Sequence, residues 1–132
     1  MPAKILIVED ELLVAMNLEM ILEELGHEPV GIVPDLASAE PFYDASLDLA
    51  LVDLNLRDGL TGPQIAERLS ACGVPVLFIT ANPRILGNGI AGTIGVLTKP
   101  SDPSTVQAAV DYVLGVREGR QCTPPPELKL FG

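Results

Sequence analysis

Two short apolar runs, each ending in acidic side chains, constrain the fold of this chain more than any other feature. Residues 5–8 lead into Glu9 and Asp10, and residues 49–52 lead into Asp53. Apolar runs of this length predict strands that are buried on both faces of a parallel sheet. Because ligands bind at the carboxyl ends of the strands in open α/β sheets, we expect the three carboxylates to meet there.

Carboxylates that lie close together repel one another, so each resists ionisation unless a cation shares the charge. A hard divalent cation with oxygen ligands meets this requirement, typically Mg²⁺, with Mn²⁺ as an alternative. The sequence therefore predicts a magnesium site that leaves one carboxylate available for chemistry.

Two further apolar runs add a hydroxyl and a cation to the same predicted edge of the sheet. Residues 76–79 end at Thr80 and Ala81, and the next run ends at Lys99 and Pro100. A metal, a hydroxyl and an ammonium group facing a lone carboxylate suit an incoming phosphoryl group, because its transfer depends mainly on positioning and charge stabilisation. Singly, each residue is weak evidence, since Asp and Thr often cap turns.

The rest of the sequence alternates strand and helix patterns. Apolar residues at helical spacing predict a first helix from about residue 11 to 25, and residues 29–33 predict a short second strand. Further helices are expected at residues 35–43, 63–71 and 104–116. Such alternation, with right-handed crossovers, forms a parallel sheet covered on both faces. We therefore predict an α/β, flavodoxin-like (βα)5 three-layer sandwich with strand order 2-1-3-4-5.

The segment from residue 82 to 95 departs from this pattern. It contains Pro83 and four glycines, and each interior glycine costs a helix ~1 kcal/mol relative to alanine. We therefore predict that the fourth helix is short, distorted or mobile. Two interpretations remain open: a functional segment that orders on phosphorylation or binding, and drift in a tolerant loop.

Charge and composition exclude several classes of function. A net charge of −10, from 8 basic and 18 acidic residues, opposes binding to nucleic acid or to an anionic membrane. Apolar stretches fall short of the about 18 residues that a bilayer span requires, and Glu9 interrupts the N-terminal run too early for a signal peptide. The two unclustered cysteines, Cys72 and Cys122, indicate reduced thiols in a cytoplasmic protein.

Taken together, the polar residues at the predicted strand ends resemble those of the receiver domain of two-component response regulators, the family typified by the chemotaxis protein CheY. The resemblance covers residues 4–116 and rests on Glu9, Asp10, Asp53, Thr80, Ala81, Lys99 and Pro100. It implies that Asp53 accepts a phosphoryl group from a histidine kinase or a histidine phosphotransfer protein in a Mg²⁺-dependent reaction. The chain would then catalyse only its own phosphorylation and dephosphorylation.

The resemblance also implies a role for each residue around Asp53. Asp10 and Asp53 would ligate Mg²⁺ directly, Glu9 would act mainly through water, and the backbone carbonyl of Asn55 would be a further ligand. Asn55 and Asn82 would tune access of the water that hydrolyses the phosphorylated form.

Three more roles follow from the resemblance. Thr80 would hydrogen-bond a phosphoryl oxygen, and Ala81 is small, as the family requires beside the phosphate. Lys99 would pair first with Asp53 and then with the phosphoryl group, and the Lys99–Pro100 bond is expected to be cis.

One position breaks the family pattern. Val96 stands where the family usually has Tyr or Phe, and a β-branched side chain is stiff and too small to fill or vacate a ring-sized pocket. Output would then use backbone shifts of the Thr80 loop within a surface formed by the fourth helix, fifth strand and fifth helix.

A stand-alone switch that signals through protein contacts, including a phosphorylation-dependent homodimer, is one interpretation. The alternative is a phosphate sink that drains a shared histidine kinase.

Two other classes fit the sequence less well. A flavodoxin-like cofactor binder needs a phosphate-binding loop after the first strand, where this chain has acidic residues that would repel phosphate. A metal-dependent hydrolase acting on an outside substrate needs a second acid or base near Asp53, and only Asn55 stands there.

The predicted receiver domain spans residues 1–118, followed by a proline-rich tail at 119–132. Three consecutive prolines favour polyproline II and exclude helix, so we predict a disordered tail. The alternative is that apolar residues near its end dock into a groove. On the first helix, Met16 and Met20 are predicted to pack in the core rather than to form a docking patch.

Overall fold

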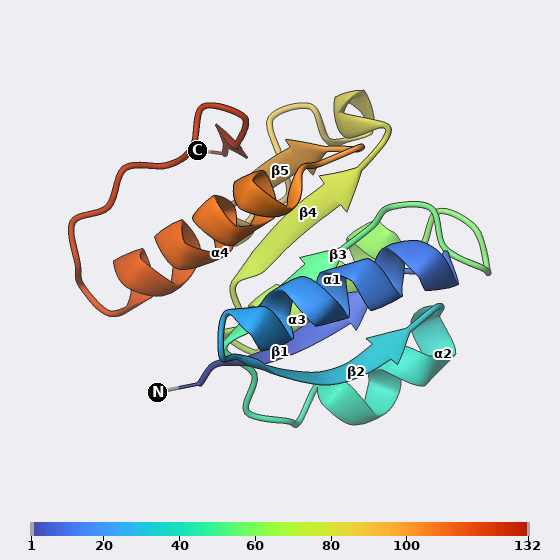
Figure 1. The fold of residues 1–132 in the computed structure, drawn as a ribbon. Coiled ribbons are helices and arrows are strands. Elements are labelled where there is room, and N and C mark those ends of the chain that lie inside the picture. The colour runs from blue at the N-terminus through green and yellow to red at the C-terminus, as the bar shows by residue number, and fades with distance from the viewer. Residues whose placement is uncertain (1, 132) are drawn as a thin grey trace.

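A six-stranded sheet forms the centre of the protein in a computed structural model that describes residues 2–131 (Figure 1). The strand order is β2-β1-β3-β4-β5-β6, in which the first five strands are parallel and β6 is antiparallel to β5. The strands are β1 Lys4–Val8, β2 Glu28–Val33, β3 Leu49–Val52, β4 Val76–Thr80, β5 Gly95–Thr98 and β6 Lys129–Leu130. The order of the parallel strands confirms the prediction.

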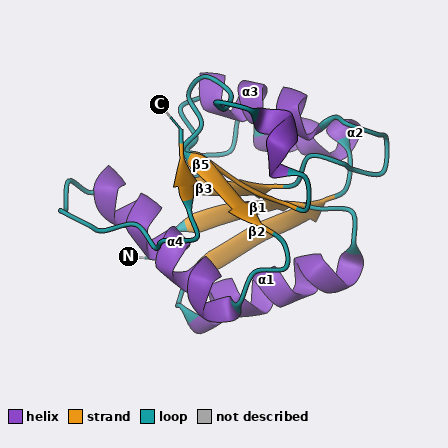
Figure 2. Cartoon of the chain, turned by 90° about the horizontal axis from the view of Figure 1, so that it is seen from above, coloured by secondary structure: helices purple, strands orange, loops and turns teal. Residues whose placement is uncertain are grey.

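Helices cover both faces of the sheet, as predicted for a three-layer sandwich. The α-helices are α1 Leu12–Glu24, α2 Leu36–Ala39, α3 Gly62–Ala71 and α4 Pro103–Arg117, and two 3-10 turns are η1 Glu40–Phe42 and η2 Pro83–Leu86. Figure 2 shows α1 and α4 on one side of the sheet and α2 and α3 on the other. The second helix is shorter than predicted, because the chain tightens into η1 after Ala39.

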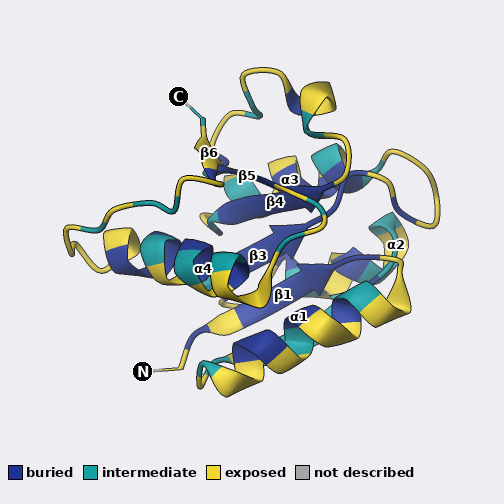
Figure 3. Cartoon of the chain, turned by 45° about the horizontal axis from the view of Figure 1, so that its top comes forward, coloured by how far each residue is buried: buried dark blue, intermediate teal, exposed yellow. Residues whose placement is uncertain are grey.

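Two apolar clusters fill the spaces between the sheet and its helices, and Figure 3 shows the buried strands between helices with exposed outer faces. Neighbouring residues of β1 divide between the clusters: Ile5 and Ile7 belong to the α1 and α4 side, and Leu6 and Val8 to the other. This division follows from the alternation of side chains along a strand. No helix among residues 2–131 has the length and apolar character needed to cross a membrane.

The first helix exposes more apolar surface than the sequence predicts. Met16 and Met20 are half exposed, at 50% and 53%, so the expectation that they pack in the core is wrong. The exposed face of α1 also carries Leu12 and Leu13. Residues Ala15, Leu18, Ile21 and Leu22 supply the buried face instead.

In place of a full fourth helix, residues 81–94 hold a single 3-10 turn, η2. The prediction that this helix is short is therefore confirmed. Gly87 and Gly89 adopt positive φ angles of 54° and 99°, a left-handed region in which an L side chain is strained and a helix cannot continue. The surface predicted from the fourth helix thus consists here of loop and turn.

The end of the C-terminal tail pairs with β5 in this structure (Figure 3), the arrangement given above as the alternative to a disordered tail. In β6, Lys129 pairs with Val96 and Leu130 with Gly95. Leu128 is buried at 6% exposure within the α1 and α4 cluster. The tail docks because β5 would otherwise end the sheet with unpaired backbone groups, and because apolar side chains flank the pairing residues.

Tail docking predicts a difference between two neighbouring leucines. Leu128→Ala removes a buried side chain and should lower the free energy of unfolding by about 2 kcal/mol. Leu130→Ala alters a side chain that is 41% exposed. It should change the free energy of unfolding by less than about 0.5 kcal/mol. Urea unfolding followed by circular dichroism measures both. Equal, negligible effects would mean that the tail does not dock in solution.

Candidate functional site

The structure brings together the three carboxylates that the sequence placed at the strand ends. Oxygen atoms of Glu9, Asp10 and Asp53 lie within 4.8 Å of one another. Their proximity follows from the pairing of β1 with β3, in which the Asp53 amide also donates to the carbonyl of Val8 at 2.9 Å. Glu9 and Asp53 are buried, at 2% and 7% exposure, whereas Asp10 is exposed. The cluster is therefore closed on one side and open to solvent at Asp10.

Lys99 reaches into this cluster from the end of β5. Its Nζ donates to Asp53 Oδ2 at 2.8 Å and to Glu9 Oε1 at 2.5 Å. Its backbone amide donates to the carbonyl of Thr80 at 2.8 Å, which holds the end of β5 beside the end of β4. The sequence predicted the contact with Asp53 but missed the contact with Glu9, because nothing in the pattern showed how deeply Glu9 is buried.

Burial and charge change the acidity of the two groups that meet at the Lys99 ammonium. Burial raises the pKa of Glu9 to about 7, although hydrogen bonds from Lys99 and the Glu11 amide act in the opposite direction. Burial alone would lower the pKa of Lys99, but its hydrogen bonds to Asp53 and Glu9 outweigh that effect and raise it. Lys99 thus stays charged at neutral pH and partly compensates the carboxylates.

The donor set fits a hard divalent cation. All three clustered groups offer carboxylate oxygens, and the exposed Asp10 leaves the cluster open to an ion and its water ligands. The amide of Leu54 donates to Asp53 Oδ1 at 2.7 Å, so Asp53 Oδ1 and Oδ2 are both oriented by hydrogen bonds. Asn55 follows in an exposed position of the same loop.

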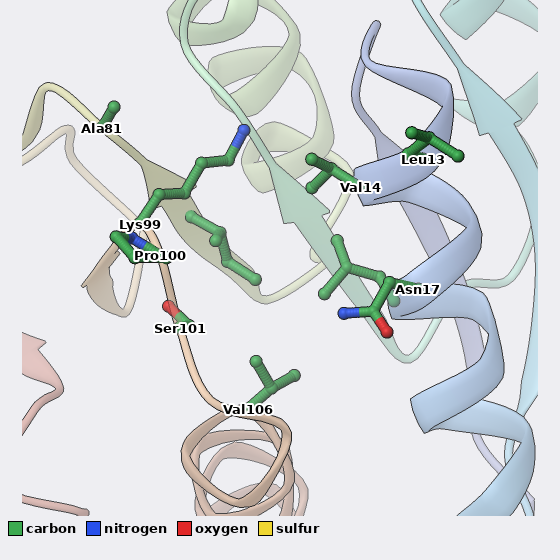
Figure 4. A pocket seen from close by; sticks show the side chains of 10 residues that line it. Leu13, Val14, Asn17, Ala81, Lys99, Pro100, Ser101 and Val106 are labelled. Atoms are coloured by element: carbon green, nitrogen blue, oxygen red, sulfur yellow. The ribbon is translucent and has the colours of Figure 1, made fainter.

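The other predicted residues lie around the end of β4. Thr80 is buried and its hydroxyl accepts a hydrogen bond from the Asn82 amide at 3.1 Å. Ala81 and Lys99 line a cavity of about 480 Å³ between α1 and the start of α4 (Figure 4). Val96 is buried in β5, outside the group of carboxylates. The Lys99–Pro100 peptide bond is cis, as expected.

A contact that the sequence did not predict fixes the loop after Asp53. The Arg57 guanidinium pairs with Asp35, and the Arg57 amide donates to the carbonyl of Pro34 at 3.0 Å. The amide of Leu36 donates to Asp58 Oδ2 at 3.0 Å. These contacts join the β3–α3 loop to the β2–α2 corner across the end of β1. The two side-chain contacts join residues 22 apart, a separation at which local sequence patterns carry no signal.

Comparison with known proteins agrees with this geometry. Residues 5–111 match the family described as response regulator receiver domain. The chain is 36% identical over 118 residues to the phyllosphere-induced regulator PhyR of Methylorubrum extorquens, covering 86% of this chain and 44% of that protein. The chain spans about half the length of the curated relatives that it matches, from 44% to 50%.

Solved structures of relatives share the fold. The chain superimposes on the anti-anti-sigma factor PhyR of Bartonella quintana with a TM-score of 0.76 and 30% identity, covering 90% of this chain and 50% of that one. It superimposes on SdrG of Sphingomonas melonis with a TM-score of 0.70 and 36% identity, covering 86% and 97%.

The raised pKa of Glu9 predicts a pH-dependent stability in magnesium-free buffer. Between the ordinary pKa of 4.5 and about 7, the unfolded chain has released the Glu9 proton while the folded chain keeps it. The unfolding free energy contributed by Glu9 therefore falls as pH rises through this window. Glu9→Gln should be more stable than the wild type by about 1–2 kcal/mol at pH 8, and by much less near pH 5. Urea unfolding at several pH values measures this difference, and a constant difference would contradict the assignment.

Proposed function

The chain belongs to the response regulator receiver domain family, and on that basis we propose that its Asp53 accepts a phosphoryl group from a phosphohistidine. The donor is a histidine kinase or a histidine phosphotransfer protein. The observation that carries this proposal is the 2.8 Å contact between Lys99 Nζ and Asp53 Oδ2 inside a carboxylate cluster. That contact supports the proposal because a cation beside Asp53 would stabilise the negative charge that develops on a transferred phosphoryl group.

The proposed transfer forms a bond between Asp53 Oδ and phosphorus as the bond from phosphorus to the histidine nitrogen breaks. Asp10, Asp53 and the Asn55 carbonyl would hold Mg²⁺, with Glu9 acting through water, and the bound ion would supply positive charge beside the phosphoryl oxygens. Lys99 exchanges its contact with the Asp53 carboxylate for one with a phosphoryl oxygen.

The end of β4 completes the proposed phosphoryl site. Thr80 uses its hydroxyl hydrogen to donate to a phosphoryl oxygen, while its oxygen still accepts from the Asn82 amide. The methyl group of Ala81 leaves room for the phosphate. Hydrolysis of the acyl phosphate restores Asp53, and the exposed side chains of Asn55 and Asn82 regulate how water reaches phosphorus.

The exposed apolar face of α1 is the proposed docking site for the phosphoryl donor. Leu13, which is 83% exposed, lines the same 480 Å³ cavity as Lys99 and Ala81 (Figure 4). Met16 and Met20 extend this face along the helix, and methionine adapts to differently shaped partners. A helix of the donor lying along this face would bring its histidine to the open side of the cluster.

Output through protein contact is the proposed consequence of phosphorylation, including a phosphorylation-dependent homodimer. The surface would combine the 81–94 segment, β5 and α4, in a cytoplasmic protein that binds neither nucleic acid nor membrane. The Bartonella relative, an anti-anti-sigma factor, supports a protein target, although the chain spans half of it. A phosphate sink is the second candidate, favoured by the small Val96 and by the single 3-10 turn after Thr80. Beryllofluoride, a phosphoryl analogue, separates the two candidates. Binding of a partner or self-association by the loaded chain but not by the free chain favours the switch, and no such binding favours the phosphate sink.

Phosphorylation of Asp53 is tested with acetyl phosphate as donor. In the presence of Mg²⁺, intact mass spectrometry should show the wild type gaining one phosphate and Asp53→Asn gaining none. Asp44→Asn, which alters an exposed carboxylate elsewhere, is the matched control and should gain the same phosphate. Absence of a phosphate on the wild type with this donor and with a phosphohistidine donor would refute the proposal.

Metal binding is tested separately by calorimetric titration of the unphosphorylated chain. The wild type should bind one Mg²⁺, and Asp10→Asn should weaken this binding by about tenfold or more, because a direct anionic ligand is lost. The matched control is Asp102→Asn, an exposed carboxylate after β5, which should leave the dissociation constant unchanged. Equal affinities for the wild type and Asp10→Asn would contradict the assigned ligand set.

A further inference from the structure

The C-terminal strand contacts the segment that continues from Thr80 and Ala81. Lys129 Nζ donates to the carbonyl of Gly87 at 3.2 Å, and the amide of Phe131 donates to the carbonyl of Ile94 at 3.0 Å. The Phe131 ring lies 6.3 Å from the ring of Phe78, measured between centroids. The tail therefore touches the middle and the end of the 81–94 segment, and also β4 just before Thr80.

This contact leaves no space at Gly89. A methyl group at Gly89 would lie 2.3 Å from Cγ of Phe131, so the ring is seated directly on the glycine backbone. Phe131 belongs to the same apolar cluster as Phe78, Leu86, Ile90 and Val96. In a full-length helix, side chains of the 81–94 segment itself would cover this part of the sheet, whereas here the tail contributes an aromatic ring.

The 81–94 segment needs such support because its own hydrogen bonds are few and local. Its internal backbone bonds span three residues each, as in the bond from the Gly87 amide to the Arg84 carbonyl, and glycines weaken it further. An unsupported segment of this kind would have to be ordered when a phosphoryl group binds to Thr80 and Ala81. Ordering a flexible loop on binding lowers the affinity for the ligand, whereas an already ordered loop does not incur this cost.

We propose that Lys129 and Phe131 are positioning residues for the phosphoryl site: the docked C-terminal strand holds the 81–94 segment, and with it Thr80 and Ala81, in the conformation that binds the phosphoryl group. This inference rests on the proposed phosphorylation of Asp53. Because binding linkage is reciprocal, a phosphoryl analogue at Asp53 must in turn strengthen docking of the tail.

The test uses the full chain and compares three consecutive side chains of the tail, those of residues 129–131. Phe131→Ala and Lys129→Ala should slow phosphorylation by acetyl phosphate and weaken binding of beryllofluoride in the presence of Mg²⁺, by about fivefold for Phe131→Ala. Leu130→Ala is the matched control, because this side chain lies on the same strand without a contact to the segment among those described. It should leave both quantities unchanged.

A second pair of variants tests the same contact from the other side. Gly89→Ala and Gly87→Ala both place a methyl group at a positive φ, but only the one at Gly89 meets Phe131. The structure predicts that Gly89→Ala impairs beryllofluoride binding more than Gly87→Ala does. This comparison separates displacement of the tail from backbone strain in the loop, and it remains informative if Phe131→Ala destabilises the fold.

Hydrogen exchange supplies a readout that a purely structural role would not change. Loading with beryllofluoride and Mg²⁺ should slow exchange of the Phe131 amide, which donates to Ile94, and leave the amide of Lys4 at the opposite end of the sheet unchanged. Unaltered exchange, or phosphorylation of the Phe131 and Lys129 variants at the wild-type rate, would overturn the inference. A wild type that takes no phosphate would instead refute the function on which it rests.

Discussion

The ammonium group of Lys99 is the interaction on which the rest of the site depends. It lies within hydrogen-bond distance of both Glu9 and Asp53, and it is the single cation placed among three carboxylates in the described chain. Burying acidic groups without compensation costs several kcal/mol. Lys99 supplies part of this compensation, and burial still raises the pKa of Glu9 to about 7. The remaining imbalance is what favours a divalent cation.

Sheet topology explains why so much of this site could be predicted from the sequence. Asp53 and Thr80 directly follow buried apolar runs, Lys99 follows another after Thr98, and parallel strands end at one edge of the sheet. The positions of the residues along the chain therefore fix their positions in space. The sequence reports the ends of strands well because polar residues interrupt apolar runs there.

The features that could not be predicted depend on pairings between distant segments. Arg57 meets Asp35 only because the loops after β2 and β3 face each other across β1, and no local pattern records this encounter. The tail was expected to be disordered because three prolines exclude helix. Proline does not exclude a short edge strand further along. Leu128 and Phe131 belong to apolar clusters on opposite faces of the sheet because the tail pairs with the distant strand β5, and no local pattern records that pairing.

The same tail bears on how a signal could leave the proposed phosphoryl site. Val96 is too small to relay a change through movement of its own side chain, and it is paired with Lys129 across the β5–β6 ladder. A shift of the Thr80 backbone would instead reach Gly87 and Gly89, where Lys129 and Phe131 are seated. The bulky side chain that a relay requires thus comes from Phe131, directly after β6, rather than from β5. A switch built in this way would change the accessibility of the β5 edge, a surface well suited to contact with another protein.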